Sequence, residues 1–301
     1  MHPAPSLILF STLSGLGLGM MAWLGFASSF AAPPYGWHAF WLWAVAFALA
    51  VGGLASSTFH LGHPERALLA FTQWRSSWLS REAWVAVATL VVAGLFAIGQ
   101  IFLAANWWPL GLLLVPLAIA TVFCTAMIYA QLRTVPRWNT GLTPTLFVLH
   151  ALAGGAILTG YYRAAAMLIA ALVALQIVVW SRGDRRFAER GTTIESATGL
   201  GRIGSVRLFE RPHTGSNYLT REMVHVVGRK HRAKLRLVVL ACVGVVPVVL
   251  LAFGHTGAAI VALLFHLVGL FAARWLFFAE AEHLVGLYYG AHRRVGEPLG
   301  A

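Results

Sequence analysis

Side chains that can exchange protons or bind a polar ligand gather between residues 60 and 82, a segment that we call loop 2. It contains the motif His60-Leu-Gly-His63-Pro-Glu65-Arg66 and ends at Glu82. His60 follows one long apolar run and Glu82 opens the next, so both groups lie at membrane depth, where ionisable residues are functional-site candidates. A quinone needs hydrogen bonds to its carbonyl oxygens and a proton donor or acceptor during two-electron exchange. His60, Arg66 and Glu82 therefore predict a quinone site, with interfacial polar residues and snorkelling arginines as the alternative.

A second polar segment, loop 4 (residues 131–141), follows Tyr129 and contains Arg133, Arg137 and Trp138. Its Pro, Gly and Asn residues predict an ordered turn. Because two apolar runs separate loop 2 from loop 4, both loops lie on the same side of a membrane. Tyr129 could add a phenol to the loop 2 site, although a tyrosine at the end of a span is also typical of the interfacial aromatic belt.

The composition excludes several classes of protein. Of the 301 residues, 59% are hydrophobic and only 11% are charged, and the mean hydropathy is +0.74. Soluble domains carry about 25% charged residues, so the composition rules out a disordered chain and argues against a soluble enzyme. Cys124 and Cys242 lie inside apolar runs and form no Cys-x-x-Cys pair. We therefore expect neither a disulfide nor an iron–sulfur or zinc framework in this chain.

Eight continuous apolar runs are long enough, or nearly so, to cross a hydrocarbon core of about 30 Å as helices. Their continuity favours helices over a β-barrel, in which apolar and polar residues alternate. The runs are Leu7–Phe30, Trp37–Phe59, Ala83–Ala104, Pro109–Ala130, Leu142–Tyr161, Ala164–Trp180, Leu237–Phe253 and Ala258–Ala279. The sequence thus predicts an all-α polytopic membrane protein, with one integral membrane domain over residues 1–301 and eight transmembrane helices.

The distribution of charge predicts the orientation. The chain has 22 Lys and Arg against 10 Asp and Glu. With eight spans, loop 2, loop 4, loop 6 (residues 181–236) and the C-terminal tail share one side with the N-terminus, and they hold 20 of these cations. Arg163 lies in a loop on the other side, and Arg274 lies within the last run. The positive-inside rule therefore predicts a multi-pass protein of the cytoplasmic (inner) membrane with both termini in the cytoplasm.

Loop 6 is long and basic, with 13 Lys and Arg against 5 Asp and Glu. From residue 217 to residue 237, apolar side chains such as Leu219 and Met223 fall on one helical face, and Arg221 and Arg229 belong to the basic remainder. This pattern predicts an amphipathic helix that lies along the membrane interface. Such a helix binds lipid head groups or forms a docking platform for a cytoplasmic partner.

Two histidines inside the spans, His150 and His266, raise the question of a b-type haem. At 1.5 Å per residue, His150 lies roughly 12 Å and His266 roughly 20 Å from the cytoplasmic ends of their runs. Ligands of one iron should lie at nearly equal depth. We therefore expect hydrogen-bonded packing histidines and no haem, and a haem-bearing anchor remains an alternative that an absorption spectrum would identify.

Three passages together resemble the dimethyl sulfoxide reductase anchor-subunit family, whose members are eight-helix membrane subunits of molybdopterin oxidoreductases. The passages read STFHLGHPERAL with SREAW, YAQLRTVPRWNTGLTP, and FFAEAEHLVGLYYG. The resemblance covers nearly the whole chain. Within loop 6, TTIESATGLGRIGSVRLFERPHT and NYLTREM are similar to the branch found in cytoplasm-facing sulfite dehydrogenases.

The resemblance implies partners, a cofactor and site residues. It implies that the chain anchors a molybdopterin catalytic subunit and a ferredoxin-like iron–sulfur subunit, exchanges electrons with ubiquinone or menaquinone, and carries no haem. The quinone-binding residues of the family fall on His60, Gly62, Arg66 and Glu82, and Tyr129 matches an aromatic position before the TVP turn.

The residues that we expect to dock the partner subunits lie in loops 4 and 6. They are Arg133, Arg137, Arg221 and Arg229. The sulfoxide reductases of the family face the periplasm with both anchor termini outside, whereas the charge count here places the termini inside. This departure favours sulfite oxidation. A quinol-dependent reductase is the first alternative, and a transporter is the second.

Overall fold

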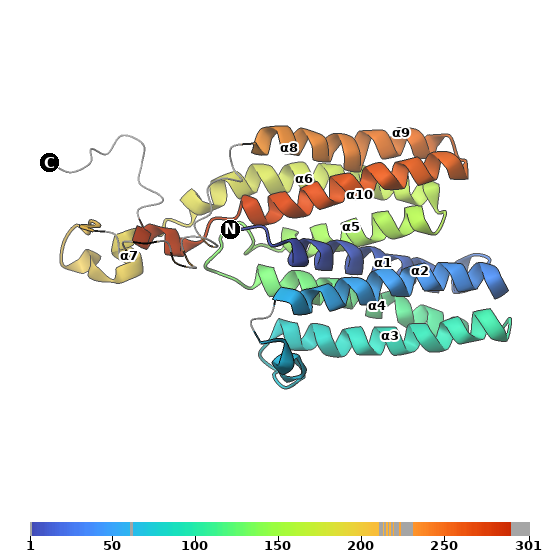
Figure 1. The fold of residues 1–301 in the computed structure, drawn as a ribbon. Coiled ribbons are helices and arrows are strands. Elements are labelled where there is room, and N and C mark those ends of the chain that lie inside the picture. Colours follow the sequence, from blue (N-terminus) through green and yellow to red (C-terminus); the bar gives the residue numbers. More distant parts are fainter. Residues whose placement is uncertain are drawn as a thin grey trace.

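The computed structural model describes residues 2–60, 63–210 and 231–289, together with the single residues 213, 215, 217, 219 and 223. Every regular element in these ranges is a helix, so the expected all-helical membrane fold is confirmed. The long helices lie side by side along one axis (Figure 1). They are α1 (Pro5–Phe30), α2 (Gly36–Ser56), α3 (Trp78–Phe102), α4 (Trp108–Ala130), α5 (Leu142–Leu158), α6 (Tyr162–Glu189), α8 (Arg232–Val239), α9 (Val246–Ala252) and α10 (Thr256–Ala279).

Seven of the described helical segments are long and apolar enough to cross a membrane, where α2 counts together with the turn that follows it, and α8 and α9 form one segment joined by the π-helical turn Leu240–Val245. The eighth expected span corresponds to α5, which has only 17 residues. Four 3₁₀ turns, Ser57–His60, Pro64–Phe71, Leu200–Arg202 and Leu284–Tyr289, and the short α7 (Ile194–Thr198) lie in the connections.

Two element boundaries differ from the expected runs. Helix α6 continues past Trp180 to Glu189, because the charged stretch that follows the apolar run is rich in Arg, Ala and Glu, which are good helix formers. Helix α5 ends at Leu158 instead of Tyr161, since Gly160 adopts a left-handed φ of 82° that closes the turn into α6. Of the amphipathic helix expected over residues 217–237, only the part from Arg232 onward, as α8, lies within the described helices.

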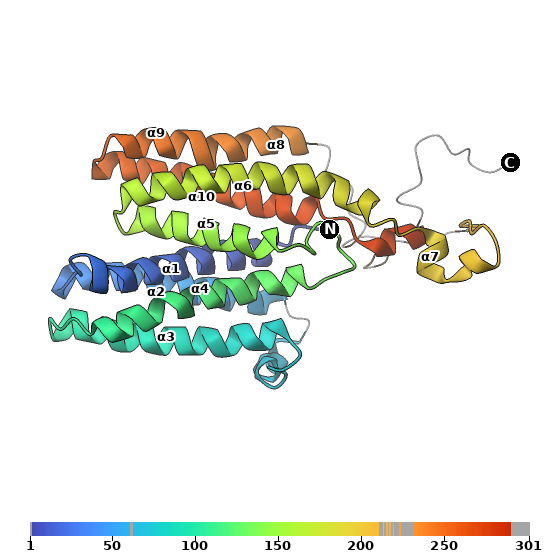
Figure 2. The ribbon, with the colours of Figure 1, turned by 180° about the vertical axis from the view of Figure 1, so that it is seen from behind.

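The bundle has two distinct ends (Figures 1 and 2). Loop 2, loop 4, α7, the Leu284–Tyr289 turn and the start of α1 lie at one end, which we call the loop-2 end. The connections around residues 31–35, 103–107, 159–161 and 253–255 lie at the other, which we call the opposite end. The polar residues singled out in loops 2 and 4 are therefore at the same end of the molecule.

Helix α1 is the central element and packs on α2, α4 and α5. Small residues allow this, because a Cβ at Gly19 would lie 1.9 Å from the Ala151 carbonyl oxygen of α5, and a Cβ at Gly53 of α2 would lie 2.2 Å from the backbone nitrogen of Ser14. Close backbone approach through Gly is the usual packing mode of membrane helices. Two hydrophobic cores meet along α1 and α5, one among α1–α5 and one among α5, α6 and α8–α10.

Replacing Gly19 with valine is expected to push α1 and α5 apart, because the added side chain would overlap the backbone at Ala151. Overpacking of this kind lowers the free energy of unfolding by about 1–3 kcal/mol. The thermal midpoint of the purified chain in detergent measures the effect. The matched control is Gly94→Val, because a Cβ at Gly94 on α3 meets nothing within 4 Å. Equal midpoints for the two variants would contradict the close contact of α1 with α5.

Candidate functional site

Glu82 is a buried carboxyl group in the first turns of α3, with 3% of its surface exposed. The hydroxyl of Thr125 on α4 donates a hydrogen bond to its Oε1. About two turns further along α3, the hydroxyls of Thr89 and Thr121 are 2.9 Å apart. Thr121, Thr125 and Tyr129 follow one another at intervals of four residues and therefore share one face of α4. The α3–α4 contact is thus a polar seam that begins at Glu82.

Tyr129 ends this seam inside an aromatic cluster. Its ring centroid lies 5.4 Å from that of Trp138 in loop 4 and 5.5 Å from those of Phe277 and Phe278 near the end of α10. Phe147 of α5 completes the cluster at 5.9 Å. Tyr129 is buried, so its phenol is held rigidly between loop 4 and α10 instead of sitting at a lipid-facing belt.

Loop 2 is fixed to α3 by two long side chains. The guanidinium of Arg81 donates to the backbone carbonyls of Trp74 at 3.0 Å and Arg75 at 2.7 Å, and it lies over the Trp78 ring at 4.4 Å. The indole of Trp84 donates to the Phe71 carbonyl at 3.0 Å. Arg81 therefore has a structural role, which leaves the exposed Arg66 available for a ligand.

Arg66 lies in the Pro64–Phe71 turn, and the surface around it is apolar and exposed. Leu68 is 78% exposed and Phe59, at the end of the α2 span, is 85% exposed. Leu69, Trp74 and Trp84 are also exposed. Loop 2 thus combines a cation and an apolar surface that suits a lipid-soluble molecule, within the same connection that leads to the buried Glu82.

The remaining predicted residues are distributed as follows. The backbone of His60 closes the Ser57–His60 turn, but its side chain lies outside the described part of the structure, as do Gly62, Arg221 and Arg229. Arg133 is exposed in loop 4. Of the predicted quinone residues, the described ones therefore fall into a buried pair, Glu82 and Tyr129, and one exposed arginine, while Arg137 belongs to a different cluster.

Arg137 is part of a ring of four charges that ties the loop-2 end together. It binds Asp184 of α6 at 2.5 Å and Glu280 at 3.2 Å. Arg236 of α8 binds the same two carboxylates, Asp184 at 2.8 Å and Glu280 at 2.7 Å. This four-charge ring joins loop 4, α6, α8 and the end of α10, so the conformation of loop 4 depends on groups far away in the sequence.

Loop 4 is also held by hydrogen bonds to its surroundings. Trp138 Nε1 donates to the Phe277 carbonyl at 2.9 Å, and its ring stacks on that of Phe277. Asn139 Nδ2 donates to the Ala130 carbonyl at 2.7 Å, while Arg186 donates to the Asn139 carbonyl at 3.0 Å. The ordered turn that its Pro, Gly and Asn residues predict is formed by these contacts.

Sequence reasoning missed three residues that the structure places near the predicted ones. Thr125 was not identified, although its spacing of four residues from Tyr129 is a usable signal. The same applies to Thr121. Arg274 of α10, which we expected only as a cation near the end of the last span, is buried and lies with its guanidinium carbon 3.5 Å from the centroid of Phe147, a ring of the Tyr129 cluster.

The comparisons with known proteins agree with this arrangement. The family model of the DMSO reductase anchor subunit (DmsC) matches residues 1–290. The chain belongs to that family. A relative from Allochromatium vinosum, which is named as a sulfite dehydrogenase subunit, is 33% identical over 330 aligned positions that cover 96% of this chain and 99% of the relative. As a member of the DMSO reductase anchor family with seven apolar helices of spanning length, the chain is an integral membrane protein and a membrane anchor subunit.

Removing the charge of Glu280 is expected to destabilise the protein more than removing that of Asp184. Both carboxylates bind Arg137 and Arg236, but the side chain of Glu280 is only 3% exposed, whereas that of Asp184 is 32% exposed. Breaking a buried ion pair costs about 3–5 kcal/mol, because it leaves an uncompensated charge. Thermal unfolding of Glu280→Gln and Asp184→Asn in detergent tests this order, and a larger loss for Asp184→Asn would contradict it.

His283, just beyond α10, predicts a pH dependence. Its Nδ1 accepts a hydrogen bond from the backbone N–H of Val285 at 3.0 Å, and partial burial lowers the pKa of this imidazole. Because the pKa is lower in the folded state, the stabilisation is present above the unfolded value and is lost as the pH falls through the folded value. Hydrogen exchange at residues 284–289, corrected for the intrinsic rate, should therefore accelerate on acidification. The His283→Gln variant should not show this dependence, and an identical response of both proteins would contradict the assignment.

Proposed function

We propose that this subunit anchors a molybdopterin oxidoreductase and holds its quinone site, so that electrons from sulfite oxidation in a partner subunit reach the membrane quinone pool. Membership of the DMSO reductase anchor family supports the anchoring role. The likeness to a membrane relative named for sulfite dehydrogenase, over nearly the whole of both chains, supports sulfite as the substrate of the complex.

The buried Glu82–Thr125 pair is the observation that carries the quinone site. Quinone reduction consumes two electrons and two protons, so the site needs a group that can hold a proton close to water. Glu82 lies inside the bundle yet only a few residues from loop 2. Ser80, in the same part of α3, has a buried hydroxyl without a hydrogen-bond partner among the described residues. The donor set of Glu82, Ser80 and Arg66, next to exposed apolar side chains, fits a quinone ring with an isoprenoid tail.

Each residue has a separate task in this proposal. Arg66 attracts and orients a carbonyl oxygen, since a guanidinium is a fixed charged donor. Glu82 holds and releases a proton, and the Thr125 hydroxyl fixes the orientation of its carboxyl group. Tyr129 maintains the end of α4 against loop 4 and α10, and His60 and Gly62 complete the site on the α2 side. Ubiquinone or menaquinone, when bound, supplies the two-electron chemistry.

The partner subunits dock on the loop-2 end. The exposed cations Arg133, Arg182, Arg185 and Arg190 of loop 4 and the α6 extension lie there, and the charge of this end suits an acidic ferredoxin-like surface. Arg137 supports this surface from below through the four-charge ring. Arg221 and Arg229 of loop 6 add to it.

The proposed orientation has eight spans with both termini in the cytoplasm of a cell with an inner membrane. Helix α5 is about 25 Å long at 1.5 Å per residue, and it is enclosed by α1, α4, α6 and α10, so a short hydrophobic length is tolerated. The basic loops place the loop-2 end in the cytoplasm.

A quinol-dependent reductase is the second candidate, because the family is named after DMSO reductase. The same site serves both directions, since the anchor exchanges electrons with a quinone in either case. Assays of the isolated complex with sulfite and with a sulfoxide as substrates distinguish the two.

The Glu82→Gln variant of the intact complex is expected to lose quinone-coupled sulfite oxidation by at least about 100-fold, the usual contribution of a general acid or base. Activity with an artificial dye that accepts electrons from the catalytic subunits should be unchanged. Thr125→Val should lower the quinone-coupled rate by about tenfold, since a hydrogen bond to a charged group is worth about 1.5–3 kcal/mol. The control is Glu65→Gln, which changes an exposed carboxyl group in the same loop. Full quinone turnover in Glu82→Gln would refute the site.

The orientation is tested by labelling with a membrane-impermeant maleimide. Ser76 in loop 2 and Ser29 near the opposite end are both exposed. A cysteine at position 76 should react only in inverted membrane vesicles, whereas one at position 29 should react only in intact cells with a permeabilised outer envelope. The reverse pattern would contradict a cytoplasmic catalytic side.

A further inference from the structure

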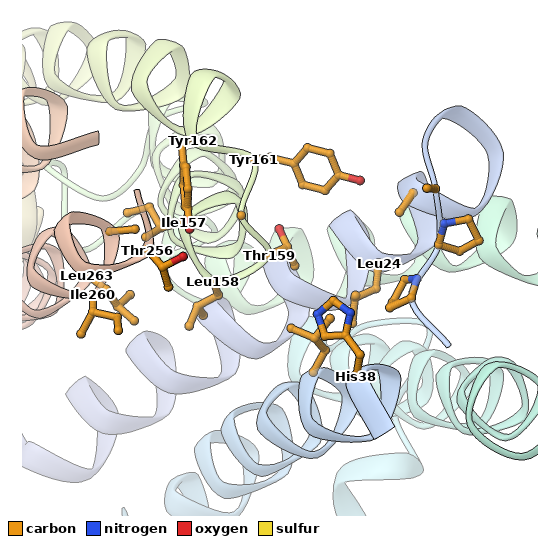
Figure 3. A pocket seen from close by; sticks show the side chains of 17 residues that line it. Leu24, His38, Ile157, Leu158, Thr159, Tyr161, Tyr162, Thr256, Ile260 and Leu263 are labelled. Atoms are coloured by element: carbon orange, nitrogen blue, oxygen red, sulfur yellow. The ribbon is translucent and has the colours of Figure 1, made fainter. Parts of the chain in front are cut away.

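A cavity of about 580 Å³ opens at the opposite end of the bundle, far from loop 2 (Figure 3). The ends of α1, α2, α5, α6 and α10 surround it. His38, Thr159, Tyr162 and Thr256 contribute polar groups, and His38 and Thr256 are exposed. The cavity therefore reaches the aqueous boundary and can hold water between the two hydrophobic cores.

A buried imidazole lies directly beneath this cavity. Among the lining residues, Ile157 on α5 and Leu263 on α10 lie furthest toward the loop-2 end. Gly154 and His266 are each three residues further along, or about 4.5 Å. A Cβ at Gly154 would lie 3.6 Å from His266 Nε2, so the two face each other. His266 is fully buried, and neither of its ring nitrogens has a hydrogen-bond partner among the described residues.

A second cavity, of about 20 Å³, lies further toward the loop-2 end between α5, α6 and α10. Its polar lining includes His150, Gln176 and Arg274, and His150 is four residues, or about 6 Å, from Gly154 along α5. His150 Nδ1, Gln176 Oε1 and Arg274 Nε are buried without a partner in the described part of the chain. The volume is sufficient for one water molecule, which needs two to four polar partners.

The small cavity continues into the four-charge ring. Arg137 and Glu280, two members of that ring, line it as well. Arg137 and Val179 also line a third cavity of about 270 Å³ at the loop-2 end, together with Arg182 and other polar side chains of α6. Polar groups and cavities thus follow one another between α5, α6 and α10 from one end of the bundle to the other.

We propose that this row of groups is a proton path across the membrane, in which His266 and His150 relay protons between waters in the three cavities. Unpaired polar atoms inside a membrane protein are costly and mark ion or proton pathways. An imidazole both donates and accepts hydrogen bonds, as proton hopping requires. A space that admits one water excludes hydrated metal ions and larger solutes. The path is separate from the α3–α4 seam that holds Glu82.

Arg274 is the barrier in this path. Its guanidinium lines the same cavity as His150, and no carboxylate binds it among the described residues. A fixed positive charge in a narrow pore opposes the passage of protons. The path of the resting chain therefore conducts slowly, and neutralising Arg274 opens it.

Proton flux into liposomes tests the proposal. The full chain is reconstituted in vesicles loaded with potassium and a pH-sensitive dye, and valinomycin sets the driving potential. We expect Arg274→Gln to conduct protons about tenfold faster than the unsubstituted chain, which corresponds to about 1.4 kcal/mol. Adding His266→Leu to Arg274→Gln should return the flux to that of protein-free vesicles, and adding His150→Leu should do the same.

The matched control adds Gln100→Leu to Arg274→Gln, because Gln100 is an equally buried polar residue in the other core, where it accepts a hydrogen bond from Trp43. This variant should keep the raised flux. Flux in Arg274→Gln that equals the unsubstituted chain, or that survives His266→Leu, overturns the proposal and leaves the histidines with a packing role. Size-exclusion profiles and thermal midpoints identify variants that have not folded, for which His266→Gln replaces His266→Leu.

Discussion

The constraint on which this structure depends is the pairing of charged and polar groups inside a bundle that is surrounded by lipid. An uncompensated charge in such a place costs several kcal/mol, so each polar group needs a neighbour, a water molecule or a ligand. The four-charge ring satisfies this constraint for Asp184 and Glu280 by surrounding them with Arg137 and Arg236. Glu82 satisfies it through Thr125. The groups whose needs are not met by the described residues, such as Ser80 and His266, are where ligands or water are to be sought.

The two hydrophobic cores divide the labour between these polar groups. The α3–α4 seam begins at loop 2 and contains the proposed quinone residues, whereas the row of histidines lies between α5, α6 and α10. Helix α1 separates them, and its glycines fix the distance between the two halves. Both halves end at the loop-2 end, where loop 4 connects the Tyr129 cluster to the four-charge ring. Electron exchange and proton movement would therefore be served by different helices of one anchor subunit.

The number and type of the elements followed from the sequence, because long apolar runs have few structural solutions in lipid. The paired location of loops 2 and 4 also followed, since alternate loops share a side. The partners of individual side chains did not. Arg137 looked like a docking residue, yet it is enclosed by Asp184 and Glu280, which are 47 and 143 residues away along the chain. Such pairings depend on helix packing, and a hydropathy pattern does not specify which helices touch. Thr125, in contrast, was accessible from its spacing to Tyr129.

The most direct measurement of the central claim is photoaffinity labelling of the intact complex with a photoreactive quinone, followed by mapping of the labelled peptides. The account predicts labelling of loop 2 and the first turns of α3, and it predicts that excess natural quinone suppresses the label. Labelling confined to the opposite end, or to peptides of α6 and α10 alone, would contradict the quinone site at Glu82.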